Sequence, residues 1–347
     1  MSVQVRPVAP TLTEKKMSIK EQILSSKIKR IQLDPFGYCN AKCWFCPVKY
    51  IEQPEETRTH IPIELVDKIF SDLIEERSKE NGVVDPSFNL FLTAHYNEVL
   101  LYKDFDKLLE LARKYRLTTF VLSNGVSLSK QKIDLIKEYK DVVTHIGLNI
   151  PAFEKELWAK RSGFTEDHFE RLISNLEYAS EHLSYLNNSL QIHVNGVEKS
   201  INIPGSALIR GKDFDDSMDL DPLTGEHETQ YQLAKKLFPK FTVTKSGLMD
   251  RAGHMTHIFS NQEWLRNVYS NKKVVGCSNW GDRITDWVHI NSLGEAFLCC
   301  NDYTFEYKYG DFKTQTAREI WGSDLHIATA ERALEGICTK CLAAKFE

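Results

Sequence analysis

The chain has 347 residues, of which 42% are hydrophobic and 27% charged, and its formal net charge at pH 7 is −4. No stretch approaches the ~18 consecutive apolar residues of a membrane-spanning helix, and the first residues contain no signal-peptide core. We therefore expect a cytoplasmic protein without a membrane partner, and the slightly acidic total does not favour a nucleic-acid partner. Composition excludes a fibre, a membrane protein and a disulfide-dense small scaffold.

A short polar arm, with a helix expected over residues 18–29, precedes a regular alternation of strands and helices. Strands are expected at 31–36, 88–93, 118–122, 142–150, 190–197 and 241–244, and helices at 62–78, 105–115, 130–139, 167–182 and 228–237. This alternation favours a parallel α/β fold, either an open barrel or a doubly wound sheet.

The last third of the chain departs from that pattern. An acidic, turn-rich stretch at 202–227 is expected to be an excursion between the fifth strand and its helix. From about residue 255 the alternation stops, and two short strands, at 288–290 and 296–298, are predicted beside a group of cysteines.

The eight cysteines form two groups, and none lies between residues 46 and 277. The groups are Cys39-x3-Cys43-x2-Cys46, and Cys277, Cys299, Cys300 and Cys338-x2-Cys341. A reducing cytosol keeps such residues as thiols. Two separate groups therefore indicate two metal sites.

The first group offers three thiolates on one loop. A structural zinc site needs four ligands, and no fourth Cys or His lies close by in the sequence. Three thiolates on a four-iron cluster would instead leave one iron open for a substrate or cofactor. Free thiols, or zinc completed by a distant ligand, remain the alternatives.

The segment YCNAKCWFCPVKY, with Phe45 in the aromatic position, resembles the C-x3-C-x-aromatic-C hallmark of the radical S-adenosylmethionine (SAM) superfamily. This resemblance implies a partial (β/α)6 TIM-like barrel and a [4Fe-4S] cluster, held by Cys39, Cys43 and Cys46, that binds SAM. Other family landmarks follow in order, although Val99 and Ser123 replace the usual proline and threonine. They imply SAM contacts from Phe45, Glu98, Ser123, Asn124, Asn149 and Arg161.

Four cysteines of the second group can close a fully ligated cluster, and a four-cysteine zinc site is the alternative. The segment beginning CCNDY and ending EIW resembles the C-terminal SPASM/twitch extension of radical SAM enzymes, and Arg251-Ala252-Gly253 resembles the turn that precedes it. The cysteines are too few for two auxiliary clusters. The resemblance therefore implies a small α+β domain with one auxiliary [4Fe-4S] cluster, held by Cys277, Cys299, Cys338 and Cys341.

The resemblance also suggests three segments: an N-terminal arm or cap helix at 1–28, the radical SAM barrel at 29–254 and the auxiliary-cluster domain at 255–347. Cys300 is left over. It is either a buried small hydrophobe or a donor of a hydrogen atom to a substrate radical. Three other residues, His95, His193 and Arg251, remain ambiguous: either histidine could act as a base, and Arg251 could recognise a substrate carboxylate, phosphate or hydroxyl.

The function expected from the resemblance is abstraction of a substrate hydrogen by a 5′-deoxyadenosyl radical. Oxidation of a sugar, cyclitol or related small-molecule alcohol is the first expectation, because it needs one auxiliary electron acceptor and a base. Epimerisation of a sugar or peptide, with Cys300 as hydrogen donor, and other peptide modification are the alternatives. A non-enzymatic zinc or iron–sulfur module is a remote one. A reductant such as flavodoxin or ferredoxin is the expected protein partner.

Overall fold

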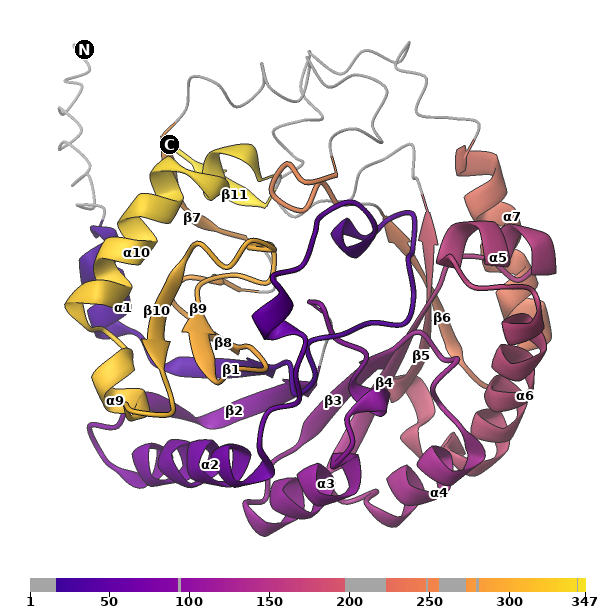
Figure 1. The fold of residues 1–347 in the computed structure, drawn as a ribbon, viewed down its shortest axis with the longest axis horizontal. Coiled ribbons are helices and arrows are strands. Elements are labelled where there is room, and N and C mark those ends of the chain that lie inside the picture. The colour runs from indigo at the N-terminus through magenta and orange to yellow at the C-terminus, as the bar shows by residue number, and fades with distance from the viewer. Residues whose placement is uncertain are drawn as a thin grey trace, which may run out of the picture.

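The computed structural model describes residues 17–92, 95–196, 223–247, 249–255, 273–278, 281–341 and 343–347. A nine-stranded sheet with the order β10-β9-β8-β1-β2-β3-β4-β5-β6 organises the chain. Its parallel part curves into an open barrel, with helices on the outside (Figure 1). The predicted partial barrel is confirmed.

The barrel strands are β1 (Ile28–Leu33), β2 (Val84–Leu92), β3 (Thr119–Ser123), β4 (Val143–Ile150), β5 (Leu190–Gly196) and β6 (Thr242–Gly247). The helices that follow them are α2 (Ile63–Ser78), α3 (Phe105–Lys114), α4 (Lys130–Glu138), α5 (Lys155–Ser162), α6 (Asp167–His182) and α7 (Leu223–Leu237). All six predicted strands and all five predicted barrel helices are present, with ends shifted by a few residues.

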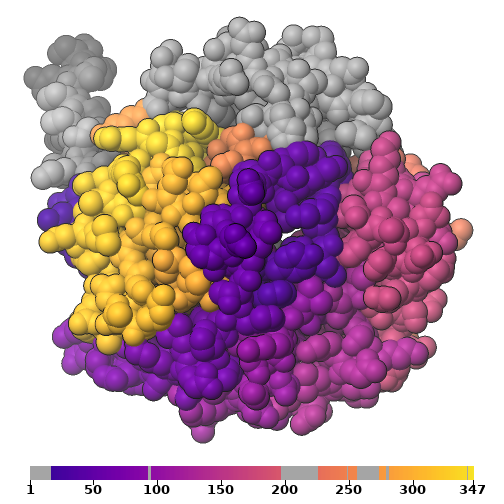
Figure 2. Space-filling model, in the orientation of Figure 1, coloured from indigo at the N-terminus to yellow at the C-terminus, as the bar shows by residue number. Residues whose placement is uncertain are grey.

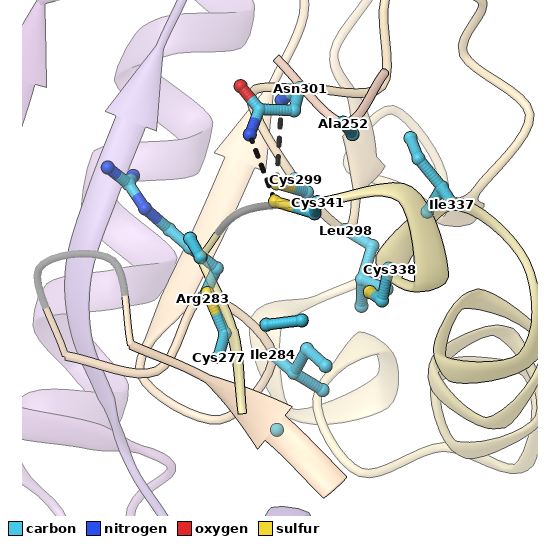
Figure 3. Close-up of a pocket in the computed structure, with 13 residues that line it drawn as sticks. Ala252, Cys277, Arg283, Ile284, Leu298, Cys299, Asn301, Ile337, Cys338 and Cys341 are labelled. Carbon is cyan, nitrogen blue, oxygen red and sulfur yellow. Dashed lines mark hydrogen bonds between the residues drawn. The ribbon is translucent and has the colours of Figure 1, made fainter. Parts of the chain in front are cut away.

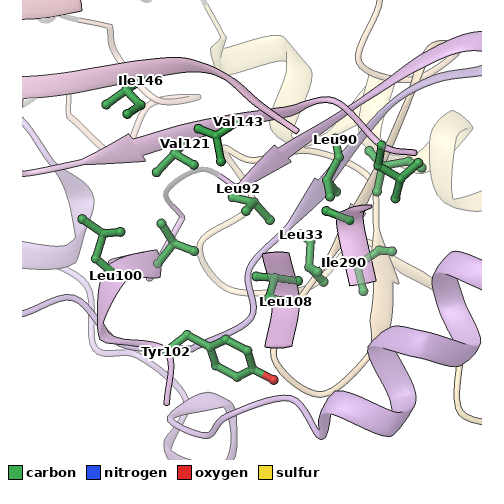
Figure 4. Close-up of a cluster of buried hydrophobic side chains, with 14 of the residues drawn as sticks. Leu33, Leu90, Leu92, Leu100, Tyr102, Leu108, Val121, Val143, Ile146 and Ile290 are labelled. Carbon is green, nitrogen blue, oxygen red and sulfur yellow. The ribbon is translucent and has the colours of Figure 1, made fainter. Parts of the chain in front are cut away.

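The outer face of the sheet forms the main hydrophobic core. Leu33, Leu90 and Val121 come from neighbouring strands and are at most 1% exposed. They lie in one layer with Ile290, under helix residues such as Leu108 (Figure 4). Burial of each such side chain contributes about 1.5–3 kcal/mol, so the outer layer fixes the curvature on which the inner face depends.

The inner face carries polar and aromatic side chains, because successive residues of a strand point to opposite sides of a sheet. Strand register places Gln32 beside Phe91 and His289, and Phe120 beside Phe91 and His145. These five positions form one level of the barrel interior. Residues that follow the strands stand above this level, where a parallel barrel holds its site.

Strands near the C-terminus extend the barrel. β8 (Trp287–Ile290) pairs with β1 in parallel, and β9 (Glu295–Phe297) and β10 (Lys308–Asp311) follow antiparallel. This region also contains β7 (Val274–Cys277), paired with β11 (Ala344–Phe346), and helices α9 (Ala317–Ile320) and α10 (Asp324–Glu335). The strands predicted near 288–290 and 296–298 are confirmed. The boundary at 254/255 stays a prediction, since the sheet continues across it.

Three expectations about local elements were wrong. The N-terminal helix α1 (Ile19–Ser25) ends four residues early, because Ile28 already begins β1, and it contacts α10. Helix α7 begins at residue 223, so the supposed excursion at 202–227 ends before it; residues 202–222 lie outside the described part of the chain. Helix α5 was not predicted. None of the described helices is long and apolar enough to cross a membrane.

Candidate functional site

Three cysteine thiols come together on the loop that follows β1. Cys39, Cys43 and Cys46 are electrostatic neighbours of one another. Burial, together with nearby Glu98, raises the pKa of the Cys39 thiol to about 12, and burial also raises the pKa of Cys43 and Cys46. Metal ligands must lose these protons. The three thiols therefore suit a site where a positively charged metal centre replaces the protons.

The end of helix α5 holds this loop in place. The amides of Lys42 and Trp44 donate hydrogen bonds of 2.8 Å to the carbonyls of Ser162 and Arg161. Gly163 follows at φ 76°, where a Cβ would lie 2.7 Å from Cβ of Lys42. The Arg161-Ser162-Gly163 segment is therefore a docking point for the cysteine loop, a role that the sequence did not suggest.

The guanidinium of Arg161 is buried and already has partners. It donates to the Pro151 carbonyl at 3.2 Å and to the Glu226 carboxylate at 2.5 Å, and it lies over the Trp44 ring. Asn149 lies half-buried near the end of β4. A direct contact of Arg161 or Asn149 with SAM stays a prediction.

The carboxylate of Glu98 ties the turn after β2 to the end of β3. It accepts hydrogen bonds from the Ser123 hydroxyl at 2.8 Å and from the Asn124 amide at 2.9 Å. The Asn124 side chain donates to Asn40 Oδ1 at 2.8 Å, inside the cysteine loop. Burial raises the pKa of Glu98 to about 7. Three of the predicted SAM-binding residues thus form one network around the first cysteine group.

Phe45 packs edge-on against Trp44 and is 9% exposed. The cysteine loop that carries both side chains borders a hollow in the middle of the face seen in Figure 2, where the loop is indigo. This hollow lies above the barrel strands and beside the three thiols. A cofactor bound by the thiols would contact a substrate there.

Four thiols of the second group surround a separate pocket (Figure 3). They come from the end of β7, the turn after β9 and the segment after α10, and they are Cys277, Cys299, Cys338 and Cys341. Most other lining side chains are apolar. Asn301 donates from its backbone to Cys299 Sγ at 3.4 Å and from its side chain to Cys341 Sγ at 3.9 Å.

The donor set and the N–H···S contacts fit an iron–sulfur cluster. Among the described residues, no three His, Cys, Asp or Glu side chains lie close enough to hold a single metal ion. The four thiols instead surround a pocket, which suits a cluster because its cysteines bind different iron atoms. Hydrogen bonds to the sulfurs are one means by which proteins set a cluster's potential.

Comparison with known families shows the family of the chain. A Radical SAM superfamily model matches residues 33–196, and a model of the SPASM iron–sulfur cluster-binding domain matches residues 277–342. The chain is a radical SAM enzyme with a C-terminal SPASM domain. Its domains imply a [4Fe-4S] cluster that binds SAM and an auxiliary iron–sulfur cluster.

Solved structures share the fold of this radical SAM enzyme at low sequence identity. BtrN in complex with AdoMet and 2-DOIA aligns with TM-score 0.51 and 14% identity, over 92% of this chain and 93% of that one. SuiB of Streptococcus suis bound to precursor peptide SuiA gives 0.56 and 14%, over 89% and 68%. anSMEcpe with bound AdoMet gives 0.55 and 12%, over 90% and 86%.

A curated relative matches over a shorter length. The tRNA-2-methylthio-N(6)-dimethylallyladenosine synthase of Thermodesulfovibrio yellowstonii is 28% identical over 136 residues, which is 39% of this chain and 30% of that protein. The radical SAM enzyme therefore spans less than a third of this relative.

Cys300, in the SPASM domain, is buried but does not line the four-thiol pocket. Its thiol lies next to Cys299, His289 and Arg283. A hydrogen bond with Cys299 is the largest cause that lowers the pKa of Cys300. Binding of iron by Cys299 would remove the Cys299 thiol proton and with it this hydrogen bond to Cys300.

A buried acid–base pair adjoins Cys300. Asp34 follows β1 and His95 follows β2, and Asp34 Oδ2 lies 4.0 Å from His95 Nδ1. Neither of these two atoms has a hydrogen-bond partner among the described residues, while His95 Nε2 lies 3.1 Å from the Asp302 carbonyl. Burial lowers the pKa of His95 to about 3 and raises that of Asp34.

Sequence reasoning left His95 ambiguous and missed Asp34 and His289. The position of Asp34 directly after the first strand was the available signal, because residues there reach the site of a parallel barrel. His289 gave no signal, since its strand joins the barrel only through tertiary pairing with β1. His193, in contrast, meets Thr244 Oγ1 at 2.8 Å, as a satisfied core histidine does.

Proposed function

We propose that this radical SAM enzyme inverts a carbon centre of its substrate, a sugar or a peptide, with Cys300 as the residue that returns the hydrogen. The observation that supports the proposal is the place of Cys300: a buried thiol outside the four-thiol pocket, next to Cys299 and to the buried groups His289 and Asp34. When bound, SAM and the first cluster supply the 5′-deoxyadenosyl radical, and the auxiliary cluster exchanges single electrons.

Groups next to Cys300 can restore its thiol after it has given a hydrogen atom to the substrate. After one hydrogen atom leaves the substrate carbon, the S–H bond of Cys300 breaks and a C–H bond forms on the opposite face. The sulfur radical then needs one electron and one proton. Cys299, a proposed ligand of the auxiliary cluster, is its neighbour in the chain, and His289 lies close enough to deliver a proton.

Dehydrogenation of an alcohol carbon, the first expectation from the sequence, is the second candidate. The Asp34–His95 pair favours it, because oxidation of an alcohol releases a hydroxyl proton that a base must accept. The electron would then leave towards the auxiliary cluster. BtrN binds 2-DOIA, and SuiB binds the precursor peptide SuiA. We therefore retain both a small molecule and a peptide as candidate substrate classes, and peptide modification as a candidate reaction. We place the enzyme in the cytoplasm, with flavodoxin or ferredoxin as reductant.

The solvent isotope distinguishes the two candidates. Full-length holoenzyme, SAM and dithionite are incubated in D2O with the small-molecule and peptide fractions of a cell extract, and products are found by mass spectrometry. Epimerisation gives an isomer of the substrate that carries one deuterium in place of one hydrogen, because the Cys300 thiol exchanges with solvent. Dehydrogenation gives a product lighter by two hydrogen atoms and supports the second candidate instead.

Cys300→Ser and Cys300→Ala provide the matched test of the residue itself. An alcohol O–H bond is too strong to quench a carbon radical, so both variants should form 5′-deoxyadenosine but no deuterated isomer. If either variant still makes that isomer, Cys300 is not the donor.

A further inference from the structure

A strained turn carries Arg251 between the two cysteine sites. Arg251, Ala252 and Gly253 all have positive φ, at 49°, 55° and 87°, and the Met255 amide closes the turn on the Asp250 carbonyl at 2.9 Å. Two consecutive residues with a Cβ in the left-handed region are costly, at about 1–3 kcal/mol each. Strain of this kind persists only where surrounding structure enforces it.

The auxiliary site enforces it on one side of the turn. Ala252 lines the four-thiol pocket, and a Cβ on Gly253 would lie 3.2 Å from Cβ of Lys340, between Cys338 and Cys341. In Figure 1 this turn, in orange, lies between the yellow C-terminal segment and the indigo cysteine loop. The turn therefore packs on the auxiliary hairpin.

The Arg251 side chain lies near residues of the first cysteine group and near Cys300. Its main electrostatic neighbours are Tyr303, Cys300 and Cys46, so it lies near both the first cysteine loop and the proposed hydrogen donor, and the adjacent Asp250 adds a smaller effect. Burial works against its charge, and these neighbours more than compensate, so the net pKa of the guanidinium is raised. A guanidinium keeps its proton in proteins, so Arg251 is cationic, and the residue is only partly covered.

Among the described residues, no carboxylate forms an ion pair with this cation. Some other arginines of the chain do have acids: Arg161 is paired with Glu226, and Arg113 with Asp141 at 2.6 Å. For Arg251 the described part of the chain supplies charge nearby but no salt bridge. A partly buried guanidinium has five N–H donors, and this one forms no ion pair with a carboxylate of the described residues. Such a group is suited to bind an anion.

We propose that Arg251 binds an oxyanion of the substrate, either a carboxylate or a phosphate, and so anchors it between Cys46 and Cys300. The placement of the substrate between Cys46 and Cys300 rests on the proposed function. Guanidinium binds both groups through two parallel hydrogen bonds, which fixes orientation as well as position. An anchor at this point would hold the reacting carbon beside the Cys300 thiol.

Calorimetry of anion binding tests the proposal without turnover. Oxygen-free holoenzyme with SAM is titrated with inorganic phosphate and, separately, with acetate. At least one of the two should bind, and Arg251→Gln should weaken that binding by about tenfold or more. Arg251→Lys should weaken it less, because the charge remains but the paired donors are lost. Arg113→Gln, at an exposed ion pair, is the matched control and should change nothing.

The anion that binds identifies the substrate group as phosphate or carboxylate. Iron content and the spectrum of the reduced clusters are measured in each variant, so that loss of a cluster is not mistaken for loss of a binding site; Arg251→Lys serves if Arg251→Gln loses iron. If neither anion binds, or if Arg251→Gln binds as the wild type does, Arg251 only offsets cluster charge and the proposal is wrong. If Cys300 proves not to be the hydrogen donor, the phosphate and acetate affinities would be unchanged, so the two proposals fail independently.

Discussion

The carboxylate of Glu98 accepts a hydrogen bond of 2.9 Å from the backbone amide of Asn124. The contact joins the turn after β2 to the end of β3, and the Asn124 side chain extends it to Asn40 in the cysteine loop. Residues that the family resemblance assigns to SAM thus also hold one another and the loop of the first cluster.

Glu98→Gln should weaken SAM binding about tenfold while the protein keeps its iron. One amide oxygen can still accept from Ser123, but the amide nitrogen cannot accept from Asn124, and a buried N–H left unpaired costs about 1–3 kcal/mol. Titration calorimetry with SAM on the reconstituted enzyme measures the effect. Exposed Glu110→Gln is the control. Unchanged SAM affinity in Glu98→Gln would mean that the network does not shape the SAM site.

Gly163→Ala should remove the first cluster alone. The new Cβ would sit 2.7 Å from Cβ of Lys42 at a φ of 76°, so the cysteine loop must move away from α5. Iron should fall from about eight to about four per chain. Gly247→Ala is the matched control, because nothing lies within 4 Å of its Cβ position. Full iron content in Gly163→Ala would show that the docking contact is dispensable.

Glu76 should contribute to stability in a pH-dependent way. It is 2% exposed, and it bonds Arg318 at 2.8 Å, Lys79 at 2.8 Å and the Val83 amide at 3.2 Å, which joins α2 to α9. Glu76→Gln should lower the free energy of unfolding by about 2 kcal/mol. Glu75→Gln, at a mostly exposed site that pairs with the same Lys79, should change it by less than about 0.5 kcal/mol.

The sign of the pH effect follows from the pKa of Glu76. Burial raises it, but hydrogen bonds from Lys79, Arg318 and the Val83 amide outweigh burial, and the net pKa lies below 4.5. The stabilisation is therefore complete above 4.5 and is lost as the pH falls through the lower, folded-state value. Urea unfolding at a series of pH values should show wild type and Glu76→Gln converging in acid. If the difference in unfolding free energy between wild type and Glu76→Gln stays constant as the pH falls below 4.5, the stabilising role of the ionised Glu76 is wrong.

The barrel was predictable from sequence because its strands and helices carry strong local patterns. Helix α5 was not, because KELWAKRS has no repeating apolar face; one side chain, Trp158, stacks on Phe164 and anchors it. Strand β8 was predicted, but its place in the sheet was not, because it joins the barrel by pairing with β1 at the other end of the chain.

The site divides in the same way. Cysteine spacing pointed to the first cluster, because its three expected ligands share one loop, whereas the second was inferred mainly from the resemblance to the SPASM/twitch extension. The grouping of Asp34, His95 and Cys300 was invisible, because the three residues follow three different strands. Only the order of strands in the sheet, β9-β8-β1-β2, brings them together.

Cluster content of single-cysteine variants tests the division of labour between Cys299 and Cys300 most directly. Iron and sulfide are measured on oxygen-free, reconstituted protein, with the Cys39/Cys43/Cys46→Ala triple variant as reference. We predict about eight irons per chain in wild type and Cys300→Ala, and about four in Cys299→Ala and in the triple variant. Loss of iron in Cys300→Ala with retention in Cys299→Ala would make Cys300 the ligand and remove it as hydrogen donor.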